Sequence, residues 1–355
     1  MSLRVLLVGA GASFSTKDVE NGYLLALRAQ PGVDVYYYSL EHRLSLARDW
    51  LFKLWRARGK DPDQRPTWPD TIYRASIEAF EMALRYDVHW VLVISGCYFH
   101  PDVLEMLHRA RLRTSVLLTE SPYEDEAQAR LAGLVDVVWT TERTSAQALG
   151  AGYLRHAYDP ARHASSLPID IEVPAHDVVF VGTGFEERID ELNAVDWMGI
   201  DLGLYGNWSL LGSRAKLRDF VRGGPVNNES AVALYRRARI GLNLYRTSQT
   251  YGRGVEHVEG AQSLNPRAYE LAACGVFQVS DYRAELPETF GDAVPTFRPG
   301  QLEDVLRAYL VDSPARRYAA RQAKEHVASH TFAARAAQLL ADLDDYDDRS
   351  LAKGA

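Results

Sequence analysis

The stretch 265–270, Asn-Pro-Arg-Ala-Tyr-Glu, combines residue types that could bind an anion. Asparagine is a favoured helix N-cap, and proline suits the first helical position because that position needs no backbone N–H. Asn265 and Pro266 therefore predict a helix that begins at a defined residue. Its free N–H groups and dipole favour an anion, and Arg267 adds a full positive charge beside them. A diphosphate fits this description.

Glu270 follows Arg267 at a spacing of three residues, so both side chains lie on the same side of that helix. A carboxylate in this position can accept two hydrogen bonds from a ribose diol, as the acidic residue of a dinucleotide site does. The alternative is an intrahelical Arg/Glu pair worth about 0.2 to 0.5 kcal/mol. The spacing thus indicates either a nucleotide site or a stabilising ion pair.

Three predicted strands in the second half of the chain each run into a polar or glycine-rich turn. The turns begin with the letters GTGFEER, GNW and NLYRTSQ, and the last of them opens a long polar loop. Such a loop is uncommon without a functional reason. The candidate ligand contacts in these turns are Gly182, Arg188, Asn207, Asn243, Tyr245 and Arg246.

The first half offers two carboxylates that could act as a general base. Asp18 falls in the first turn of a predicted helix, where the dipole stabilises a carboxylate whether or not it reacts. Glu120 ends a predicted strand just before Pro122, and capping of the next helix explains it equally well. Catalytic and structural interpretations stay open for both residues.

The loop after the first predicted strand resembles a dinucleotide fingerprint only in part. Gly9 and Gly11 have the right spacing, but Phe14 occupies the position of the third glycine, and no acidic residue closes the second strand. NAD or FAD binding is therefore disfavoured. The loop is better interpreted as a Gly/Ser segment that offers backbone N–H groups and hydroxyls at a helix N-terminus.

These candidates need elements that position them, and the chain alternates short apolar runs with longer amphipathic ones. This alternation is typical of parallel sheets with crossover helices. Strands are predicted at 4–9, 33–39, 88–95, 114–120 and 135–141, and a helix at 16–30 capped by Ser15 or Thr16. A second set of strands is predicted at 177–182, 200–206, 238–245, 276–280 and 293–297. We predict an α/β fold with two Rossmann-like, doubly wound domains facing a central cleft, where ligands bind at the carboxyl ends of the strands.

The domain boundaries follow from a Pro-rich, polar segment at 159–177, which is interpreted as a linker without helical period. The first domain is assigned to residues 1–165 and the second to 166–330. Residues 331–355 are expected to form a helix, long enough to pack back on the first domain, and a polar tail. The D-x-D spacing in this tail resembles a metal-binding signature, but its place after a helix favours a solvated tail.

Composition excludes several classes of protein. The net charge of −7 over 355 residues argues against a protein whose affinity comes mainly from nucleic-acid phosphates. No apolar run reaches the roughly 18 residues of a membrane span, and no signal peptide is evident. Both cysteines stand in apolar surroundings without a disulfide pattern, and the histidines show no zinc spacing. We expect a cytoplasmic protein without a metal, and the composition leaves the oligomeric state open.

The segment 46–68 places Trp50, Trp55 and Trp68 among basic residues. Such side chains could stack on sugar rings or bases. The favoured interpretation is an amphipathic helix that buries its tryptophans.

The stretches NPRAYELAACGVFQVSDYRAELPETF, FVGTGFEERIDEL and LEDVLRAYLVDSPARRYAARQAKEHVASHTFAARAAQLL resemble the CgeB-like glycosyltransferases. The segments GASFSTKDVENGY and TESPYED are also similar to members of this family, so the resemblance covers most of the chain. It implies the GT-B fold.

In the related E-x7-E type of GT-B enzyme, the glutamate before the small-residue segment holds the ribose, and the resemblance assigns this role to Glu270. The first glutamate of that motif is replaced here by Gln262, which could still hydrogen-bond the donor sugar. Glu256 and Glu259 are alternatives for part of that role. The departure leaves an inverting or a retaining outcome open.

The resemblance implies transfer of a sugar from a nucleotide diphosphate sugar, a UDP-sugar being favoured, to an acceptor hydroxyl of a protein, a glycan or modified DNA. The second domain would bind the donor, with Asn265, Arg267 and Arg188 or Arg246 around the diphosphate, and neither a metal nor another cofactor is implied. An inverting enzyme would take its base from Asp18 or Glu120. The alternatives are a DNA glycosyltransferase acting on hydroxymethylated bases and a non-catalytic nucleotide-sugar-binding protein.

Overall fold

The computed structural model describes residues 2–11, 16–166 and 171–354. The chain divides into two compact units, which we describe separately: unit 1 contains Met1–Leu154 and Phe332–Ala355, and unit 2 contains Arg155–Thr331. Residues 155–165, which the sequence analysis placed in the first domain, belong to unit 2. There the N–H of Tyr158 donates to the carbonyl of His330 at 3.1 Å.

Unit 1 is built on a sheet of six parallel strands in the order β2-β1-β3-β4-β5-β6. The strands are β1 (Leu3–Val8), β2 (Val33–Tyr38), β3 (Trp90–Ile94), β4 (Arg113–Leu118), β5 (Val137–Thr140) and β6 (Gly152–Tyr153). The inner strands β1 and β3 are mostly apolar, as expected for a parallel sheet covered on both faces. The sequence analysis predicted five of these strands and missed β6.

The helices that cover this sheet are α1 (Lys17–Arg28), α2 (Leu40–Ala57), α3 (Trp68–Arg85), α4 (Pro101–Arg109), α5 (Asp125–Ala132) and α6 (Arg143–Leu149), with a 3-10 turn at Pro62–Gln64. Thr16 stands at the N-cap position of α1, but its side chain makes no capping hydrogen bond. The alternative cap, Ser15, lies outside the described residues.

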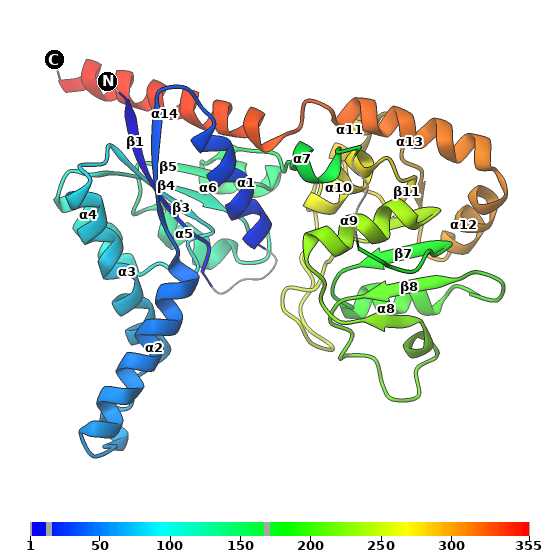
Figure 1. Ribbon diagram of the computed structural model, residues 1–355, viewed down its shortest axis with the longest axis horizontal. Coiled ribbons are helices and arrows are strands. Elements are labelled where there is room, and N and C mark those ends of the chain that lie inside the picture. Colours follow the sequence, from blue (N-terminus) through cyan, green and yellow to red (C-terminus); the bar gives the residue numbers. More distant parts are fainter. Residues whose placement is uncertain (1, 12–15, 167–170, 355) are drawn as a thin grey trace. The chain divides into compact units, whose positions relative to one another are not determined.

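Helix α14 (Phe332–Gly354) packs along unit 1 (Figure 1, red). Its start is fixed by Phe332, which occupies the space a Cβ on Gly22 would need. Further along, the Trp139 indole N–H donates to Asp342 at 2.7 Å, and the Tyr346 hydroxyl donates to Asp136 at 3.0 Å. The prediction of a solvated tail is therefore wrong, because these side chains tie the Asp-rich run to unit 1.

Unit 2 has a second sheet of six parallel strands in the order β12-β11-β10-β7-β8-β9. The strands are β7 (Val178–Val181), β8 (Leu202–Tyr205), β9 (Val221–Gly223), β10 (Ile240–Asn243), β11 (Gln278–Asp281) and β12 (Thr296–Phe297). The helices are α7 (Pro160–His163), α8 (Glu186–Asn193), α9 (Asn228–Arg237), α10 (Pro266–Cys274), α11 (Glu285–Phe290), α12 (Leu302–Val311) and α13 (Ser313–Val327), with a 3-10 turn at Lys216–Phe220. Short β9 was not predicted, and α7 contradicts the interpretation of 159–177 as a linker without helix.

Helices α2 and α3 form a hairpin that extends away from the sheet of unit 1 (Figure 1, blue). The side chain of Trp50 is 51% exposed and that of Trp68 is 44% exposed. The prediction that this segment buries its tryptophans is wrong for these two, because the hairpin projects beyond the core. No helix in the described part of the chain is long and apolar enough to cross a membrane.

Candidate active site

Helix α10 begins where the sequence predicted. The Asn265 side chain accepts a hydrogen bond from the N–H of Ala268 at 3.1 Å, and Pro266 takes the first helical position. The helix ends at Gly275, whose φ of 73° is the left-handed conformation that favours glycine. Local sequence thus fixes both ends of α10, and its N-terminus lies beside the carboxyl ends of β7 and β10.

Arg267 is held at this edge of the sheet by neutral groups. Its Nε donates to the carbonyl of Val181 at 2.9 Å, its Nη1 donates to Asn243 Oδ1 at 3.3 Å, and its guanidinium lies 4.6 Å from the centre of the Phe180 ring. Within the described residues no carboxylate forms an ion pair with it. The guanidinium is therefore preorganised and carries a charge that no acidic side chain neutralises.

Gly182 makes room for this arginine. A Cβ on Gly182 would lie 2.4 Å from Arg267 Nη2. Gly206, whose φ is +133°, lets the next turn approach equally closely, since a Cβ there would lie 2.1 Å from the Gly182 carbonyl oxygen. The two glycines predicted at strand ends therefore serve close packing around Arg267.

Asn243 and Tyr245, which were predicted to contact a ligand, are buried. Asn243 Oδ1 accepts from Asn265 Nδ2 at 2.9 Å, so this amide joins the end of β10 to the start of α10. The backbone N–H of Tyr245 donates to the Asp281 carboxylate, and its ring packs under Arg283 at 4.6 Å. Both side chains are thus packed within unit 2, and their contact with a ligand stays a prediction.

Three arginines form what we call the arginine cluster: Arg188, Arg246 and Arg267. The guanidinium groups of Arg188 and Arg246 lie 5.1 and 5.3 Å from the centre of the Phe185 ring. Arg188 also lies 5.4 Å from the Phe180 ring that Arg267 contacts. The fold thus gathers the three cations that the sequence analysis proposed for a diphosphate.

Glu270 lies one turn beyond Arg267 and is half-buried. Tyr235, on α9, is buried near both Arg267 and Glu270. Burial raises the pKa of Tyr235, and the charge of Glu270 raises it further while Arg267 opposes the shift. Glu270 is therefore close to α9 as well as to Arg267. The assignment of Glu270 to a ribose stays a prediction.

Asp281, at the end of β11, was not among the predicted site residues. Its carboxylate accepts the N–H of Tyr245 at 3.0 and 3.1 Å. Burial raises the pKa of Asp281 to about 6, against the opposing effects of that N–H and of Arg283 and Arg188. The sequence could have indicated this residue, because the apolar strand ends on Ser280 and Asp281. Asp281 is thus a carboxyl group with a raised pKa near the arginine cluster.

The long polar loop is folded against α8. Its segment 247–258 is a hairpin closed by a bridge between Ser248 and His257. Glu187 accepts the N–H groups of Thr247 and Ser248 at 2.6 and 3.0 Å. Burial disfavours its charge, but these bonds and the Ser248 hydroxyl lower the pKa of Glu187. The ionised carboxylate therefore anchors the loop.

The other predicted contacts of unit 2 lie around this loop. Asn207 is exposed, and its Oδ1 accepts the N–H of Ser209 at 3.1 Å. Gln262 is half-buried, and its carbonyl accepts the N–H of Glu285 at 3.0 Å. Glu256 and Glu259 are exposed. The contacts of Asn207 and Gln262 with the donor stay predictions.

In unit 1, the buried carboxylate beside Asp18 is Glu20, which the sequence analysis missed. Glu20 accepts the N–H of Ala10 at 2.8 Å, pairs with Lys17 at 2.9 Å, and accepts the Tyr37 hydroxyl. The sequence could have indicated this ion pair, because Glu20 follows Lys17 by three residues on a predicted helix. Asp18 itself is half-buried in the first turn of α1. Glu20 thus holds the backbone just after β1 in place. Asp18 lies in the first turn of a helix, as predicted, and its role as a base stays a prediction.

Glu120 follows β4 at the carboxyl edge of the unit 1 sheet. The N-cap position of α5 belongs to Glu124, so Glu120 does not cap that helix. Burial raises the pKa of Tyr98, and the nearby charge of Glu120 adds to this rise. Tyr98 packs directly on Gly11. Cys97 is exposed, so the prediction of apolar surroundings is wrong for this cysteine.

The chain is similar to known proteins in both sequence and fold. Residues 186–341 match the family described as glycosyl transferase-like. The spore protein CgeB of Bacillus subtilis (strain 168) is 24% identical over 275 residues, which cover 74% of this chain and 84% of CgeB. These similarities identify a glycosyltransferase related to CgeB.

Solved structures show that this glycosyltransferase has the GT-B fold. Sucrose-phosphate synthase from Thermosynechococcus elongatus superimposes with a TM-score of 0.61 at 16% identity, covering 99% of this chain and 100% of that one. Anabaena HepE in complex with UDP-glucose gives a TM-score of 0.61 at 12% identity, covering 96% and 100% of the two chains. The family match lies mainly in unit 2 of this glycosyltransferase, where α10 and the arginine cluster are found.

Proposed function

We propose that unit 2 binds a nucleotide diphosphate sugar, a UDP-sugar being favoured, and that the enzyme transfers the sugar to an acceptor hydroxyl. The observation that carries this proposal is the environment of Arg267. Its guanidinium is fixed by carbonyl, amide and aromatic groups beside the N-terminus of α10, and no described carboxylate neutralises it. The UDP-glucose complex of Anabaena HepE, which has the same fold, supports a UDP-sugar donor.

The arginine cluster suits the chemistry of sugar transfer. When the bond between sugar and diphosphate breaks, negative charge develops on the departing diphosphate. Cationic donors that are already in position stabilise such charge without further reorganisation. In our proposal Arg267 binds the diphosphate, Arg188 and Arg246 add positive charge around it, and Glu270 accepts hydrogen bonds from the ribose. The proposed reaction is independent of a metal and of any cofactor besides the donor.

The acceptor hydroxyl would lose its proton to unit 1 if the enzyme inverts the anomeric centre. Glu120 and Asp18 are the candidate bases, and both stay half-buried near the carboxyl edge of their sheet. A retaining enzyme needs neither of them as a base. In either case Gln262 is proposed to hydrogen-bond the donor sugar.

The exposed tryptophans of the α2–α3 hairpin favour one second candidate, a DNA acceptor carrying hydroxymethylated bases. Trp50 and Trp68 are exposed, and Arg74 lies 5.5 Å from the Trp50 ring. Aromatic and cationic groups together bind single-stranded nucleic acid by stacking and by charge. Salt-dependent binding of hydroxymethylated DNA, lost in the Trp50→Ala and Trp68→Ala double variant, would support this acceptor.

The main proposal is tested with a panel of UDP, GDP and dTDP sugars. Calorimetry measures binding to the full chain, and release of free nucleotide measures slow donor hydrolysis. We expect one UDP-sugar to bind and to be hydrolysed. Binding without hydrolysis or transfer to any acceptor would indicate a nucleotide-sugar-binding protein, and failure of the whole panel to bind would refute the proposed site.

A further inference from the structure

A pocket lies at the amino edge of the unit 2 sheet, opposite the carboxyl edge that holds Arg267. It is lined by the residues just before β10 and β11, namely Ala238, Arg239, Val276 and Phe277, and by one face of α13. The volume of the cavity is about 610 Å³. The amino ends of the strands border this pocket, whereas Arg267 lies at their carboxyl ends, so the pocket is separate from the proposed donor site.

Six cations line this pocket, which we call the basic pocket. They are Arg236, Arg239, Arg316, Arg317, Arg321 and Lys324. The other lining residues are apolar or small, and no carboxylate of the described chain is among them. The protein as a whole carries a net charge of −7, so this concentration of positive charge runs against its composition.

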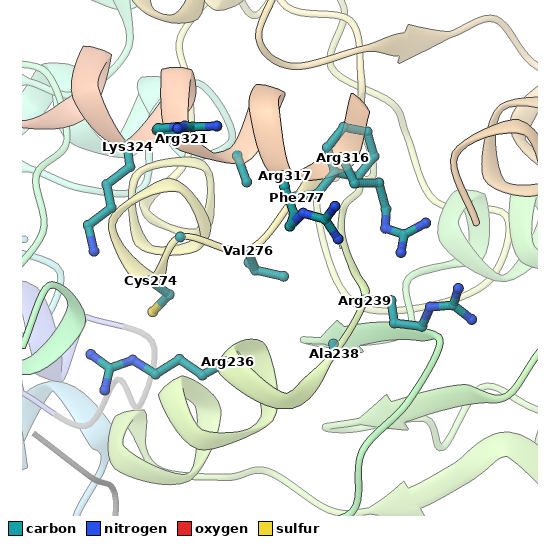
Figure 2. Close-up of a pocket in the computed structure, with 12 residues that line it drawn as sticks. Arg236, Ala238, Arg239, Cys274, Val276, Phe277, Arg316, Arg317, Arg321 and Lys324 are labelled. Atoms are coloured by element: carbon teal, nitrogen blue, oxygen red, sulfur yellow. The ribbon is translucent and has the colours of Figure 1, made fainter. Parts of the chain in front are cut away.

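The cations come from opposite walls. Figure 2 shows Arg316, Arg317 and Lys324 extending from α13 and Arg236 extending from α9 on the other side. Arg239 is paired with Asp177 at 2.8 Å, and Arg316 is buried and donates to the carbonyl of Leu310 at 2.8 Å. Burial lowers the pKa of Arg316, and the charges of Arg239 and Arg317 lower it further. The pocket therefore concentrates charges that repel one another.

The helix dipole explains only part of this arrangement. Arg236 and Lys324 lie in the last turns of α9 and α13, where the dipole favours cations. Arg316 and Arg317 are the fourth and fifth residues of α13, near the end where cations are disfavoured.

Arg317, Arg321 and Lys324 also repel one another, because they are spaced by four and three residues on one face of α13. None of the three forms an ion pair with a carboxylate in the described part of the chain. Helix stability alone therefore gives no reason for this stripe.

Cys274, at the C-terminus of α10, does not supply the missing negative charge. Burial raises the pKa of the Cys274 thiol to about 12, and the charge of Glu270 contributes, although Arg236 and Lys324 oppose the rise. At neutral pH the thiol is protonated. The thiol therefore contributes no negative charge to the pocket.

We propose that the basic pocket binds a small polyanion with two or more phosphate groups, at a site separate from the donor site. Its volume is within the range of small-molecule pockets. The stripe of Arg317, Arg321 and Lys324 on α13 can contact several phosphates at once, and charge-assisted hydrogen bonds from arginine are the strongest available for this purpose. Arg236 on the opposite wall donates to the carbonyls of His163 and Ser165 and adds positive charge to the pocket. The apolar strip formed by Ala238, Val276 and Phe277 can accommodate an uncharged portion such as a nucleoside.

The test uses calorimetric titration and thermal unfolding of the full chain with inorganic triphosphate at physiological ionic strength. The Arg321→Gln and Lys324→Gln double variant removes two exposed cations of the pocket. The matched control, Arg237→Gln with Arg298→Gln, changes two exposed cations of unit 2 that do not line it. We expect the pocket variant to bind triphosphate about tenfold more weakly and to lose the ligand-induced rise in melting temperature. The control should behave as wild type.

An Arg267→Ala variant separates this proposal from the donor site. Triphosphate binding should persist in Arg267→Ala, even if that variant no longer binds a nucleotide sugar. Loss of triphosphate binding there, or unchanged binding in the pocket variant, would overturn the proposal. Tighter binding of ATP than of triphosphate would identify a nucleotide as the ligand, and equal binding would identify a free polyphosphate. Pocket-dependent binding of single-stranded DNA without triphosphate binding would overturn the proposal in favour of a nucleic acid.

Discussion

The two edges of the unit 2 sheet handle positive charge in different ways. At the carboxyl edge, Arg267 is fixed by the carbonyl of Val181, the amide of Asn243 and the ring of Phe180. At the amino edge, Arg317, Arg321 and Lys324 form a stripe on α13 without carboxylate partners in the described residues. The first arrangement favours one geometry of a bound anion. The second attracts an anion by its positive charge but does not fix the geometry in which the anion binds.

This difference follows from how parallel α/β sheets are built. Helices begin at the carboxyl edge, so their dipoles add to Arg267 when an anion binds there. Helices end at the amino edge, so their dipoles already attract the cations around Arg236 and Lys324. An anion at the amino edge must compete with those helix ends. More cations are needed there for the same effect, and the basic pocket has six.

The largest expected effect comes from Arg267. We expect Arg267→Ala to weaken UDP-sugar binding by about one hundredfold, because a preorganised charge-assisted contact of about 1.5 to 3 kcal/mol is lost. Calorimetry measures the affinity, and Arg237→Ala is the matched control on the surface of α9. Unchanged affinity in Arg267→Ala would show that the carboxyl edge is not the donor site and would break the comparison between the edges.

Asn243→Ala should come next, because it removes the amide that joins β10 to the start of α10. The change leaves Asn265 Nδ2 and Arg267 Nη1 without an acceptor they now share. We expect unfolding in urea to lose about 1 to 3 kcal/mol of stability and donor binding to weaken in parallel. Asn265→Ala removes the helix cap and one of the two donors to Asn243 Oδ1 but leaves the bond from Arg267, and it should cost about 1 kcal/mol. Equal donor affinity in wild type and Asn243→Ala would refute the positioning role.

Asp281 makes the carboxyl edge sensitive to pH. Its pKa of about 6 in the folded protein lies above the ordinary value for aspartate, so the folded state holds this proton more tightly than the unfolded state. Its contribution to stability is therefore present below about pH 4 and is lost as the pH rises to about 6. Ionised Asp281 also adds negative charge beside the arginine cluster.

We consequently expect UDP-sugar affinity to fall several-fold between about pH 5 and pH 7. A sugar-linked diphosphate is suitable for this titration because its own charge is constant over that range. Asp281→Asn should flatten both the affinity profile and the stability profile. A pH dependence that is the same in wild type and Asp281→Asn would assign it to another group.

The comparison also shows what the sequence could reveal. The start of α10 was predicted because Asn265 and Pro266 act locally, within one turn of helix. Arg188 and Arg246 were proposed because they follow strands, and parallel strands bring their carboxyl ends together. Arg267 was proposed because it stands at the N-terminus of α10. These residues could therefore be proposed from the fold class and local sequence alone, without knowledge of how the side chains pack.

Other features depend on contacts between distant segments and could not be found in this way. The basic pocket joins α9 to α13, which lie far apart in the sequence. The amide of Asn243 is bonded to Asn265 of α10, and the raised pKa of Asp281 arises from burial, which the charge of Arg283 opposes. The exposure of Trp50 and Trp68 follows from a hairpin that projects beyond the sheet, which amphipathic patterning does not reveal.

The smallest expected effect tests the repulsion on α13 itself. Arg321→Gln removes a like charge at a spacing of four from Arg317 and three from Lys324. Without any added anion, we expect the variant to be about 0.2 to 0.5 kcal/mol more stable than wild type at low salt. The gain should disappear at high salt, where exposed charges are screened. Urea unfolding at both salt concentrations measures it, with Arg298→Gln as control. A variant that is less stable at low salt would mean that Arg321 has a structural role, and the amino edge would then resemble the carboxyl edge in fixing its cations.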